Sequence, residues 1–509
     1  MVITHNFSGS RDAAPAAREI CHAALARKAA ASGIVLLKNN GILPLAATAP
    51  IALFGNGAGH TVKGGIGSGD VNNRENISIY EGLKAVGVPL TSESWIEDYE
   101  KRYMTARFQW RDKILEDAKK VENPFDAYAD NPFVLPQGRD IEPEDWRGAA
   151  AAVYVISRIS GEGKDRTAQE GDYRLSEQER EDLRRLDAAE LPVILLINAG
   201  GPVELTDLME QMHHLAAILQ ISQLGQQGGA AVADVLLGKV VPEGKLTATW
   251  ARRYTDYPSA DTFGACNGDL EKEIYTEGIY VGYRYFDSFD IQPLFPFGYG
   301  LSYTEFSVEF EGVEADAHAV RVAVKVSNTG KLYAGREVVQ VYAACPQNGG
   351  AKEYRRLVGF AKTQQLGPGE TQCVTIAVDA KQLASFSQEK QAWILEQGVY
   401  TLFVGNSSVN CKPCAHLKVE TEKVLERTHP ICPVQHPFEE LKCAAPAMEK
   451  AALATQMKLP CVRFNPEPEE KAQAAIVPLA DGPVEELIPL LYGNITKGAS
   501  TFGSAGIRV

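Results

Sequence analysis

The chain has 509 residues, 45% of them hydrophobic and 23% charged, which fits about three globular domains and excludes a disordered or fibrous protein. Its formal net charge of −14 repels phosphate backbones, which argues against nucleic acid as a partner. No stretch has the apolar length of a signal peptide or a membrane span, so we expect a cytoplasmic protein without a membrane partner.

The first part of the chain alternates helical and strand patterns. A helix is predicted over residues 17–32, and unbroken apolar runs predict buried strands at residues 34–37, 51–54, 153–156, 193–197 and 217–221. Ser78 with Glu81, and Ser176 with Glu179, have capping-box spacing and predict the starts of two further helices. Apolar strands separated by helices predict an α/β sandwich over residues 1–305, in which helices cover a mostly parallel sheet.

Near residue 306 the pattern changes to short strands. Valines alternate with other residues over 320–326, further strand patterns cover 338–342 and 398–404, and turn sequences occupy 328–330 and 366–370. Helical patterns are missing here, so we predict a β-sandwich over residues 306–425. Residues 426–509 are predicted to be a linker that leads into a further domain.

The nine cysteines do not indicate a disulfide framework, because their number is odd and no export signal precedes them. Cys411 and Cys414 have metal-ligand spacing, but no second close pair follows, as a zinc ribbon would require. We therefore expect neither a metal nor a cofactor.

Two glycine-rich stretches and one glutamate invite a functional interpretation. Residues 55–60 (GNGAGH) follow a strand, but His60 replaces the third glycine of a dinucleotide fingerprint, so a plain turn is favoured. Residues 63–70 (KGGIGSGD) fit either a flexible surface loop or a backbone that a ligand approaches closely. Glu162 lies between two glycines just beyond a predicted strand, which suits a mobile proton donor or an ordinary exposed carboxylate.

An aromatic-rich stretch at residues 275–287 fits either a carbohydrate site or packing. Together with the segments above it resembles glycoside hydrolase family 3. The motifs come in the family's order, at residues 29–39 (AAASGIVLLKN), 63–72 (KGGIGSGDVN), 157–166 (SRISGEGKDR), 171–176 (GDYRLS), 198–204 (NAGGPVE), 233–238 (ADVLLG), 280–287 (YVGYRYFD) and 295–303 (FPFGYGLSY).

The resemblance implies a β-glucosidase-type retaining enzyme that acts on a β-glucoside or related oligosaccharide. It implies a fibronectin type III-like domain after the α/β sandwich. Glu162 would be the general acid/base, and Lys63, Gly64, Gly65, Ser68 and Asp70 would contact the substrate.

The family's nucleophile is an aspartate of a TIM-like barrel, in a Ser-Asp-Trp motif that this sequence lacks; residues 144–146 (EDW) are the nearest string. Residues 503–509 (GSAGIRV) resemble the opening of that barrel, so we expect a sandwich-first chain that ends before the barrel. It would supply the acid/base without the nucleophile, with a separate barrel subunit as a further partner. The alternative is a non-catalytic carbohydrate-binding protein or an inactive fragment.

Overall fold

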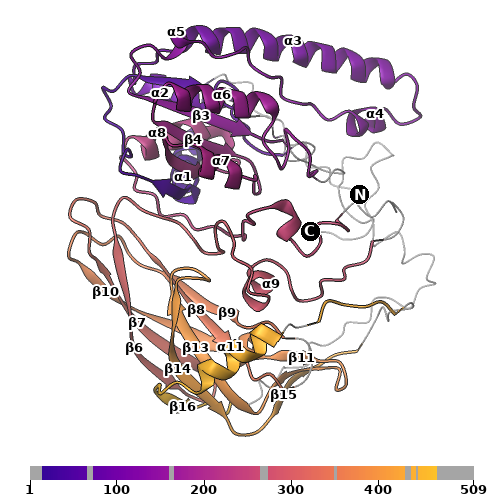
Figure 1. Ribbon diagram of the computed structural model, residues 1–509, viewed down its shortest axis with the longest axis vertical. Coiled ribbons are helices and arrows are strands. Elements are labelled where there is room, and N and C mark those ends of the chain that lie inside the picture. Colours follow the sequence, from indigo (N-terminus) through magenta and orange to yellow (C-terminus); the bar gives the residue numbers. More distant parts are fainter. Residues whose placement is uncertain are drawn as a thin grey trace, which may run out of the picture. The chain divides into compact units, whose positions relative to one another are not determined.

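The computed structural model describes residues 14–65, 71, 73–159, 166–263, 273–348, 352–429, 437–442 and 445–466 (Figure 1). Its first part is built on a five-stranded sheet in the order β1-β5-β4-β3-β2. The strands are β1 (Val35–Asn39), β2 (Ile51–Phe54), β3 (Ala151–Ser157), β4 (Val193–Asn198) and β5 (Leu215–Gln220). Strands β2 to β5 are parallel and β1 is antiparallel to β5, which confirms the predicted mostly parallel sheet.

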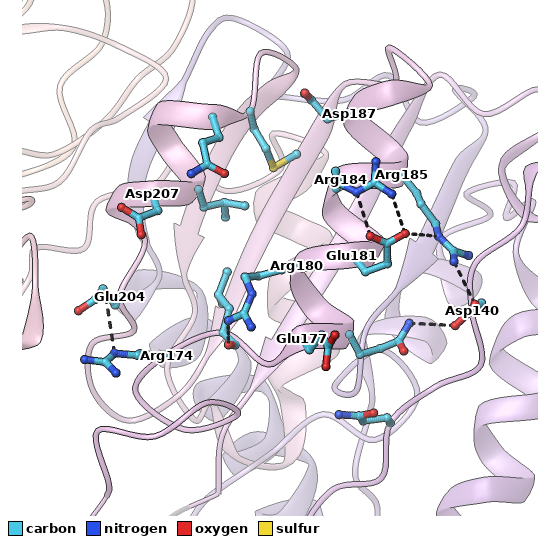
Figure 2. A pocket seen from close by; sticks show the side chains of 16 residues that line it. Asp140, Arg174, Glu177, Arg180, Glu181, Arg184, Arg185, Asp187, Glu204 and Asp207 are labelled. Atoms are coloured by element: carbon cyan, nitrogen blue, oxygen red, sulfur yellow. Dashed lines mark hydrogen bonds and ion pairs between the residues drawn. The ribbon is translucent and has the colours of Figure 1, made fainter.

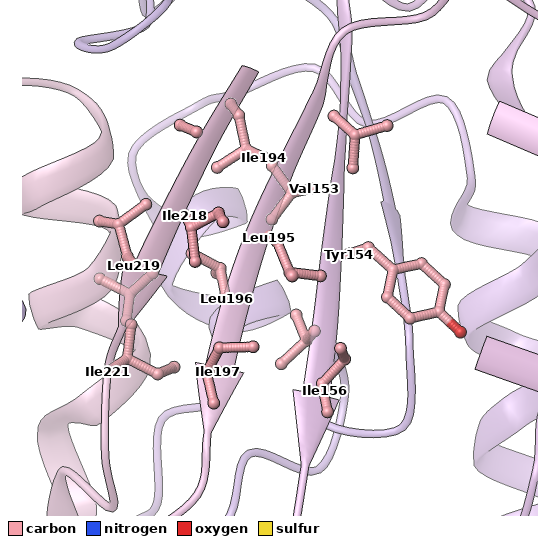
Figure 3. Close-up of a cluster of buried hydrophobic side chains, with 14 of the residues drawn as sticks. Val153, Tyr154, Ile156, Ile194, Leu195, Leu196, Ile197, Ile218, Leu219 and Ile221 are labelled. Carbon is pink, nitrogen blue, oxygen red and sulfur yellow. The ribbon is translucent and has the colours of Figure 1, made fainter. Parts of the chain in front are cut away.

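All residues of β2, β3, β4 and β5 are buried, so both faces of the sheet are covered (Figure 3). This explains why the strands appear in the sequence as unbroken apolar runs. The covering helices are α1 (Ala17–Gly33), α2 (Ile79–Ala85), α3 (Glu93–Asp117), α5 (Pro143–Trp146), α6 (Glu177–Ala188), α7 (Thr206–Gln211) and α8 (Gly228–Leu236). Helices α4 (Pro124–Asp130) and α9 (Tyr283–Ser288) complete this part.

Two of these helices begin at the predicted capping boxes. The Ser78 hydroxyl accepts from the Glu81 amide at 3.2 Å, and the Glu81 carboxylate accepts from the Ser78 amide at 2.8 Å. Ser176 and Glu179 make the same reciprocal pair at the start of α6. The motif satisfies amides that the first helical turn leaves without partners, so it marks the helix start in the sequence.

The second part consists of antiparallel strands arranged in sheets, in the orders β10-β7-β6, β16-β14-β13-β8-β9 and β11-β12-β15. The strands are β6 (Phe306–Ala315), β7 (Ala319–Asn328), β8 (Val338–Ala344), β9 (Arg356–Lys362), β10 (Thr371–Asp379), β11 (Ser385–Ser387), β12 (Ala392–Leu395), β13 (Gly398–Gly405), β14 (Cys411–Val419), β15 (Lys423–Arg427) and β16 (Cys461–Arg463). The four alternating valines of β7 are fully buried in the core of this part. The predicted β-sandwich is therefore confirmed.

Helices and a parallel pairing modify that β-sandwich. The short helix α10 (Ala380–Leu383) follows β10, where the sequence patterns predicted none, because the Asp379 carboxylate caps it through the Gln382 amide. Helix α11 (Ala445–Thr455) packs against β13, and β16 pairs in parallel with β14. The chain beyond residue 426 therefore contributes directly to this second part.

The aromatic-rich stretch serves mainly in packing against the β-sandwich. The side chain of Tyr280 is fully buried, and its hydroxyl donates to the Lys352 carbonyl at 3.1 Å. The ring of Tyr283 stacks on Phe297 with centroids 4.9 Å apart. Tyr275 differs from these, since 72% of it is exposed. Of the two interpretations of this stretch, packing fits Tyr280 and Tyr283.

No helix in the described part of the chain is both long enough and apolar enough to cross a bilayer.

Candidate functional site

A cavity of about 870 Å³ contains the described members of the predicted site. Lys63, Gly64 and Gly65, which follow β2, line it, and so does Ile159, two residues beyond β3. In open parallel sheets, ligands bind beyond the carboxyl ends of the strands, and the cavity lies where the chain leaves two such ends. Ile159 is also the last described residue before the segment that contains Glu162. We refer to this cavity as the strand-end cavity.

Three predicted site residues, Ser68, Asp70 and Glu162, lie outside the described residues. The structure therefore brings together Lys63, Gly64 and Gly65 and leaves the other three assignments as predictions. What it adds is the set of contacts that holds the neighbouring backbone in place.

Asn198, at the end of β4, fixes the start of the glycine-rich loop. Its side-chain oxygen accepts from the Val62 amide and from the Ser157 hydroxyl, both at 2.7 Å. Its side-chain nitrogen donates to the carbonyls of Val62 at 3.0 Å and Ser222 at 2.6 Å. Because Asn198 is fully buried, these bonds are shielded from water, and losing them would leave unpaired polar groups in the core. Val62 is thereby tied to the ends of β3 and β4.

The glycines of residues 55–60 have a packing role. A Cβ on Gly57 would lie 1.9 Å from the Ser157 hydroxyl oxygen, and Gly55 has a φ of +95° with the backbone of Val155 directly beside it. The Asn56 side chain accepts from the Ser157 amide at 2.8 Å and donates to its carbonyl at 3.3 Å. These contacts let β2 and β3 approach closely at their ends, in keeping with the plain turn that the sequence favoured.

The other side of the glycine-rich loop is tied to the short helix η2 (Gly225–Gln227). The Lys63 carbonyl accepts from the Gly225 amide at 2.8 Å. The Ile77 amide donates to the Gln226 carbonyl at 2.8 Å, and the Gly229 amide donates back to the Ile77 carbonyl at 2.9 Å. The chain is thus held at Lys63, before residues 66–70, and at Ile77, after them.

Arg158 anchors the chain just before the segment with Glu162. Its guanidinium makes two hydrogen bonds of 2.7 Å to the Glu179 carboxylate, and its Nε donates to the Asp172 carbonyl at 2.7 Å. Both charged side chains are less than a tenth exposed. A buried, bidentate pair of this kind holds its geometry firmly, so the backbone leading to Glu162 has a fixed starting point.

Arg166 anchors the chain just after the same segment. Its Nε donates to the Asp172 carboxylate at 2.7 Å, and its two terminal nitrogens donate to the carbonyls of Asp172 at 2.9 Å and Pro202 at 2.8 Å. Asp172 therefore accepts hydrogen bonds from both arginines that flank residues 160–165. Neither arginine nor Asp172 was singled out from the sequence, although all three lie inside the motifs at 157–166 and 171–176.

A buried carboxyl group lies in the helix behind these anchors. Asp182 in α6 is only 2% exposed, and it accepts from the Tyr154 hydroxyl and the Gln178 amide, each at 2.9 Å. Burial raises the pKa of Asp182 to about 6. Asp182 also lines a neighbouring cavity of about 680 Å³, together with Arg158, Arg166 and Asp172.

The outer side of the strand-end cavity is formed by α3 and the chain after α4. His60 stacks on Tyr103 with ring centroids 3.5 Å apart, and its Nε2 lies 2.5 Å from the Glu100 carboxylate. Phe133 meets Tyr103 edge-on at 5.5 Å, and the Arg107 guanidinium lies 5.1 Å from the centroid of Phe133. All of these residues line the cavity. We call His60, Tyr103, Arg107 and Phe133 the aromatic wall.

A second large cavity, of about 740 Å³, holds none of the predicted residues (Figure 2). Four arginines and six acidic residues line it, and they largely engage one another. Arg184 pairs with Glu181 at 2.8 Å, and Arg185 pairs with Asp140 at 3.0 Å. Charges that are already paired at an exposed surface offer little to a ligand. The strand-end cavity is therefore the better candidate site.

Comparison with known proteins accounts for both parts of the fold. Residues 34–283 match the glycosyl hydrolase family 3 C-terminal domain, and residues 337–408 match the fibronectin type III-like domain. The chain carries the C-terminal domain of glycoside hydrolase family 3. The family 3 match includes the glycine-rich loop, the Glu162 segment and both flanking arginines, so the predicted site lies within the matched domain.

Several β-glucosidases are similar to most of this chain. β-Glucosidase A of Butyrivibrio fibrisolvens is 36% identical over 431 residues, which are 76% of this chain and 50% of that protein. A β-glucosidase of Ruminococcus albus is 34% identical over 424 residues, covering 81% of this chain and 42% of that protein. The structure of β-glucosidase 3B from Thermotoga neapolitana in complex with α-D-glucose matches with a TM-score of 0.70 and 37% identity, over 80% of this chain and 55% of that one. This chain spans about half the length of the curated relatives it matches.

Proposed function

We propose that this chain supplies the acid/base part of a retaining β-glucosidase. Glu162 is the general acid/base, and Lys63, Gly64, Gly65, Ser68 and Asp70 contact the glycoside. The observation that carries the proposal is that Lys63 to Gly65 and the residue leading into the Glu162 segment line one cavity. The β-glucosidases among its relatives support the choice of substrate.

The chemistry needs two carboxylates roughly 5–5.5 Å apart. A nucleophilic carboxylate forms a bond to the anomeric carbon while the bond to the leaving oxygen breaks, and Glu162 gives its proton to that oxygen. Glu162 then takes a proton from water as the water displaces the carboxylate from the sugar. The anchors Arg158, Arg166 and Asp172 position both ends of the Glu162 segment for this exchange.

We propose further that the nucleophile comes from outside this sequence. The nearest string to the family's motif is residues 144–146, and Asp145 there is 3% exposed on its side chain and bound by Arg139 at 2.7 Å. Its carboxylate also accepts from the Glu142 amide at 2.9 Å, which makes it a structural residue of α5. A separate barrel subunit would supply the missing group. The proposed division of the chain is 1–305, 306–425 and 426–509, and residues 445–463 of the last part add α11 and β16 to the β-sandwich.

The test is hydrolysis of 4-nitrophenyl β-D-glucoside by the full chain, alone and mixed with a separately expressed family 3 barrel. We expect turnover only in the mixture. Glu162→Gln should lower that turnover by at least about 100-fold, because it removes the proton donor. Glu170→Gln is the matched control, since Glu170 is an exposed carboxylate near the same segment and pairs with Arg180.

Other results would contradict the proposal in different ways. Turnover by the chain alone would show that it carries its own nucleophile. Turnover in the mixture that survives Glu162→Gln would rule out Glu162 as the acid/base. Glucoside binding without turnover in either sample would identify a carbohydrate-binding protein instead.

A further inference from the structure

The side chains of the aromatic wall pack against one another without any ligand. Tyr103 is held between the stacked ring of His60 and the edge of Phe133, with the apolar side chains of Leu135 and Ile159 beside them. Stacked and edge-to-face ring pairs stabilise one another beyond their burial, so these contacts hold the rings of the wall in place. Aromatic side chains held along one side of a cavity suit a planar aromatic ligand group.

Arg107 is the unusual member of the wall. Its guanidinium lies 4.3 Å from the ring centroid of Trp110 and 5.1 Å from that of Phe133. In the described part of the chain no carboxylate pairs with it and no hydrogen bond is made by its five N–H groups. Its neighbours on α3 behave differently, since Arg102 pairs with Asp98 at 2.5 Å and Arg111 with Asp112 at 2.9 Å.

The acidic residues that line the same cavity do not neutralise Arg107. Glu81 is engaged by the Ser78 cap, and Glu100 by His60. Glu97 precedes Arg107 by ten residues on a continuous helix, which places their backbones about 15 Å apart along the axis, beyond the Debye length at physiological salt. The edge of the Arg107 guanidinium is therefore available for an anionic acceptor, and a planar fork of donors matches a carboxylate.

The proposed function indicates which part of a bound glycoside would contact the aromatic wall. In a retaining glycosidase the nucleophile attacks one face of the sugar, while the acid/base protonates the leaving group on the opposite face. A cavity beside the acid/base segment is thus on the leaving-group side. Resting on that proposed function, we infer that the aromatic wall is the leaving-group subsite and that it takes a planar aromatic group carrying a carboxylate, with the ring on the wall and the carboxylate on Arg107.

The inference can be tested on the full chain by calorimetric titration, without any turnover. The ligands form two matched pairs: 4-hydroxybenzoate with phenol, and 4-carboxyphenyl with phenyl β-D-glucoside. In each pair the carboxylate should tighten binding about tenfold, as a charge-assisted bidentate contact at a partly exposed site allows. Arg107→Met keeps the packing on the two rings and should abolish that preference, so that each carboxylate ligand binds no more tightly than its neutral partner.

Arg111→Met is the matched control. Arg111 lies one turn further along α3 and also covers a ring, that of Phe108 at 5.1 Å, but it does not line the cavity. Its replacement should leave the tenfold preference intact. Equal binding of both members of each pair by the wild type, or an equal effect of the two variants, would overturn the inference.

The outcomes also separate this inference from the proposed function. If the mixture with a barrel hydrolyses phenyl glucoside but the carboxylate gives no advantage, the function stands and the subsite assignment fails. If 4-hydroxybenzoate binds through Arg107 but no mixture hydrolyses any glucoside, the wall is an aromatic-carboxylate site and the glycosidase proposal fails.

Discussion

Arg158→Met should be one of the most destabilising single changes in the α/β part. Arg158 is 5% exposed and gives two bonds of 2.7 Å to Glu179, whose side chain is 9% exposed. Methionine fills a similar volume but leaves the Glu179 carboxylate buried with only the Ser176 amide as a hydrogen-bond donor, at 2.8 Å. The carbonyl of Asp172 also loses its 2.7 Å donor.

Removing one partner from a buried ion pair costs about 3–5 kcal/mol, because the remaining charge stays desolvated. That is a large fraction of the 5–15 kcal/mol that typically separates folded from unfolded domains. Arg184→Met is the control, since Arg184 is 69% exposed on its side chain and pairs with Glu181 at the surface. Its replacement should leave the stability nearly unchanged, because exposed ion pairs contribute little.

Urea unfolding followed by tryptophan fluorescence measures the difference. Trp95, Trp110, Trp146 and Trp250 lie in the α/β part and only Trp393 in the β-sandwich, so the signal reports mainly on the affected part. Adding Glu179→Gln to Arg158→Met removes the stranded charge and keeps the capping hydrogen bond, so the double variant should regain at least about 1 kcal/mol. A loss below about 1 kcal/mol for Arg158→Met, or no recovery in the double variant, would refute this reasoning.

Three further outcomes follow from the same region. Gly57→Ala should lower the melting temperature by several degrees, because the new Cβ would lie 1.9 Å from the Ser157 hydroxyl oxygen. Gly59→Ala should be nearly neutral, because the nearest neighbour of its Cβ would be Ile96 at 3.7 Å. Equal shifts in melting temperature for the two variants would contradict the packing argument. Asn198→Ala should lower the free energy of unfolding by about 2–4 kcal/mol. It should also speed hydrogen exchange at the Val62 amide, which loses its 2.7 Å acceptor. Continued protection of that amide would show that Asn198 does not hold the loop. Asp182→Asn tests the pH dependence: burial raises the pKa of Asp182 to about 6, so the folded state holds this proton more tightly than the unfolded state. The stability that the wild type gains from protonated Asp182 is therefore complete below about pH 4. It is lost, by up to about 3 kcal/mol, as the pH rises through 6. A difference in stability between wild type and variant that does not change with pH would contradict this prediction.

The sheet of the α/β part could be predicted well, because strands that are buried on both faces consist almost entirely of apolar residues. A strand buried on both faces, such as β4, tolerates only apolar side chains, and Val193 to Ile197 could be assigned on that ground alone. The capping boxes were equally readable, because their two hydrogen bonds join residues three apart. The antiparallel direction of β1 could not be predicted, since the partner of Val35 is Gln220 and no local pattern encodes it.

The candidate site was predicted less completely than the fold. The glycines at residues 64 and 65 drew attention to this loop, and the family resemblance assigned Lys63, Gly64 and Gly65 to the site. The structure places these three residues on the strand-end cavity, and their contact with a substrate stays a prediction. The aromatic wall was missed because α3 is a mainly polar helix whose buried residues, such as Trp95 and Tyr99, cluster near its start and give no sustained period. Asn198 begins the motif at residues 198–204, but no role was assigned to it from the sequence. Its importance comes from four hydrogen bonds to residues that are distant in sequence.

The position of β1 has a consequence for how this chain is made. Leu36 lies opposite Leu219 in β5 and also forms a bridge with Leu301, so both neighbours of the first strand are encoded far downstream. At about 5–20 residues per second, the ribosome needs on the order of 10–50 s to add the intervening residues. Until β5 has been made, the apolar strand has neither of its native partners and presents open hydrogen-bonding edges, which favour pairing between nascent chains. Among the strands of this sheet, β1 therefore waits longest for its neighbour in the sheet.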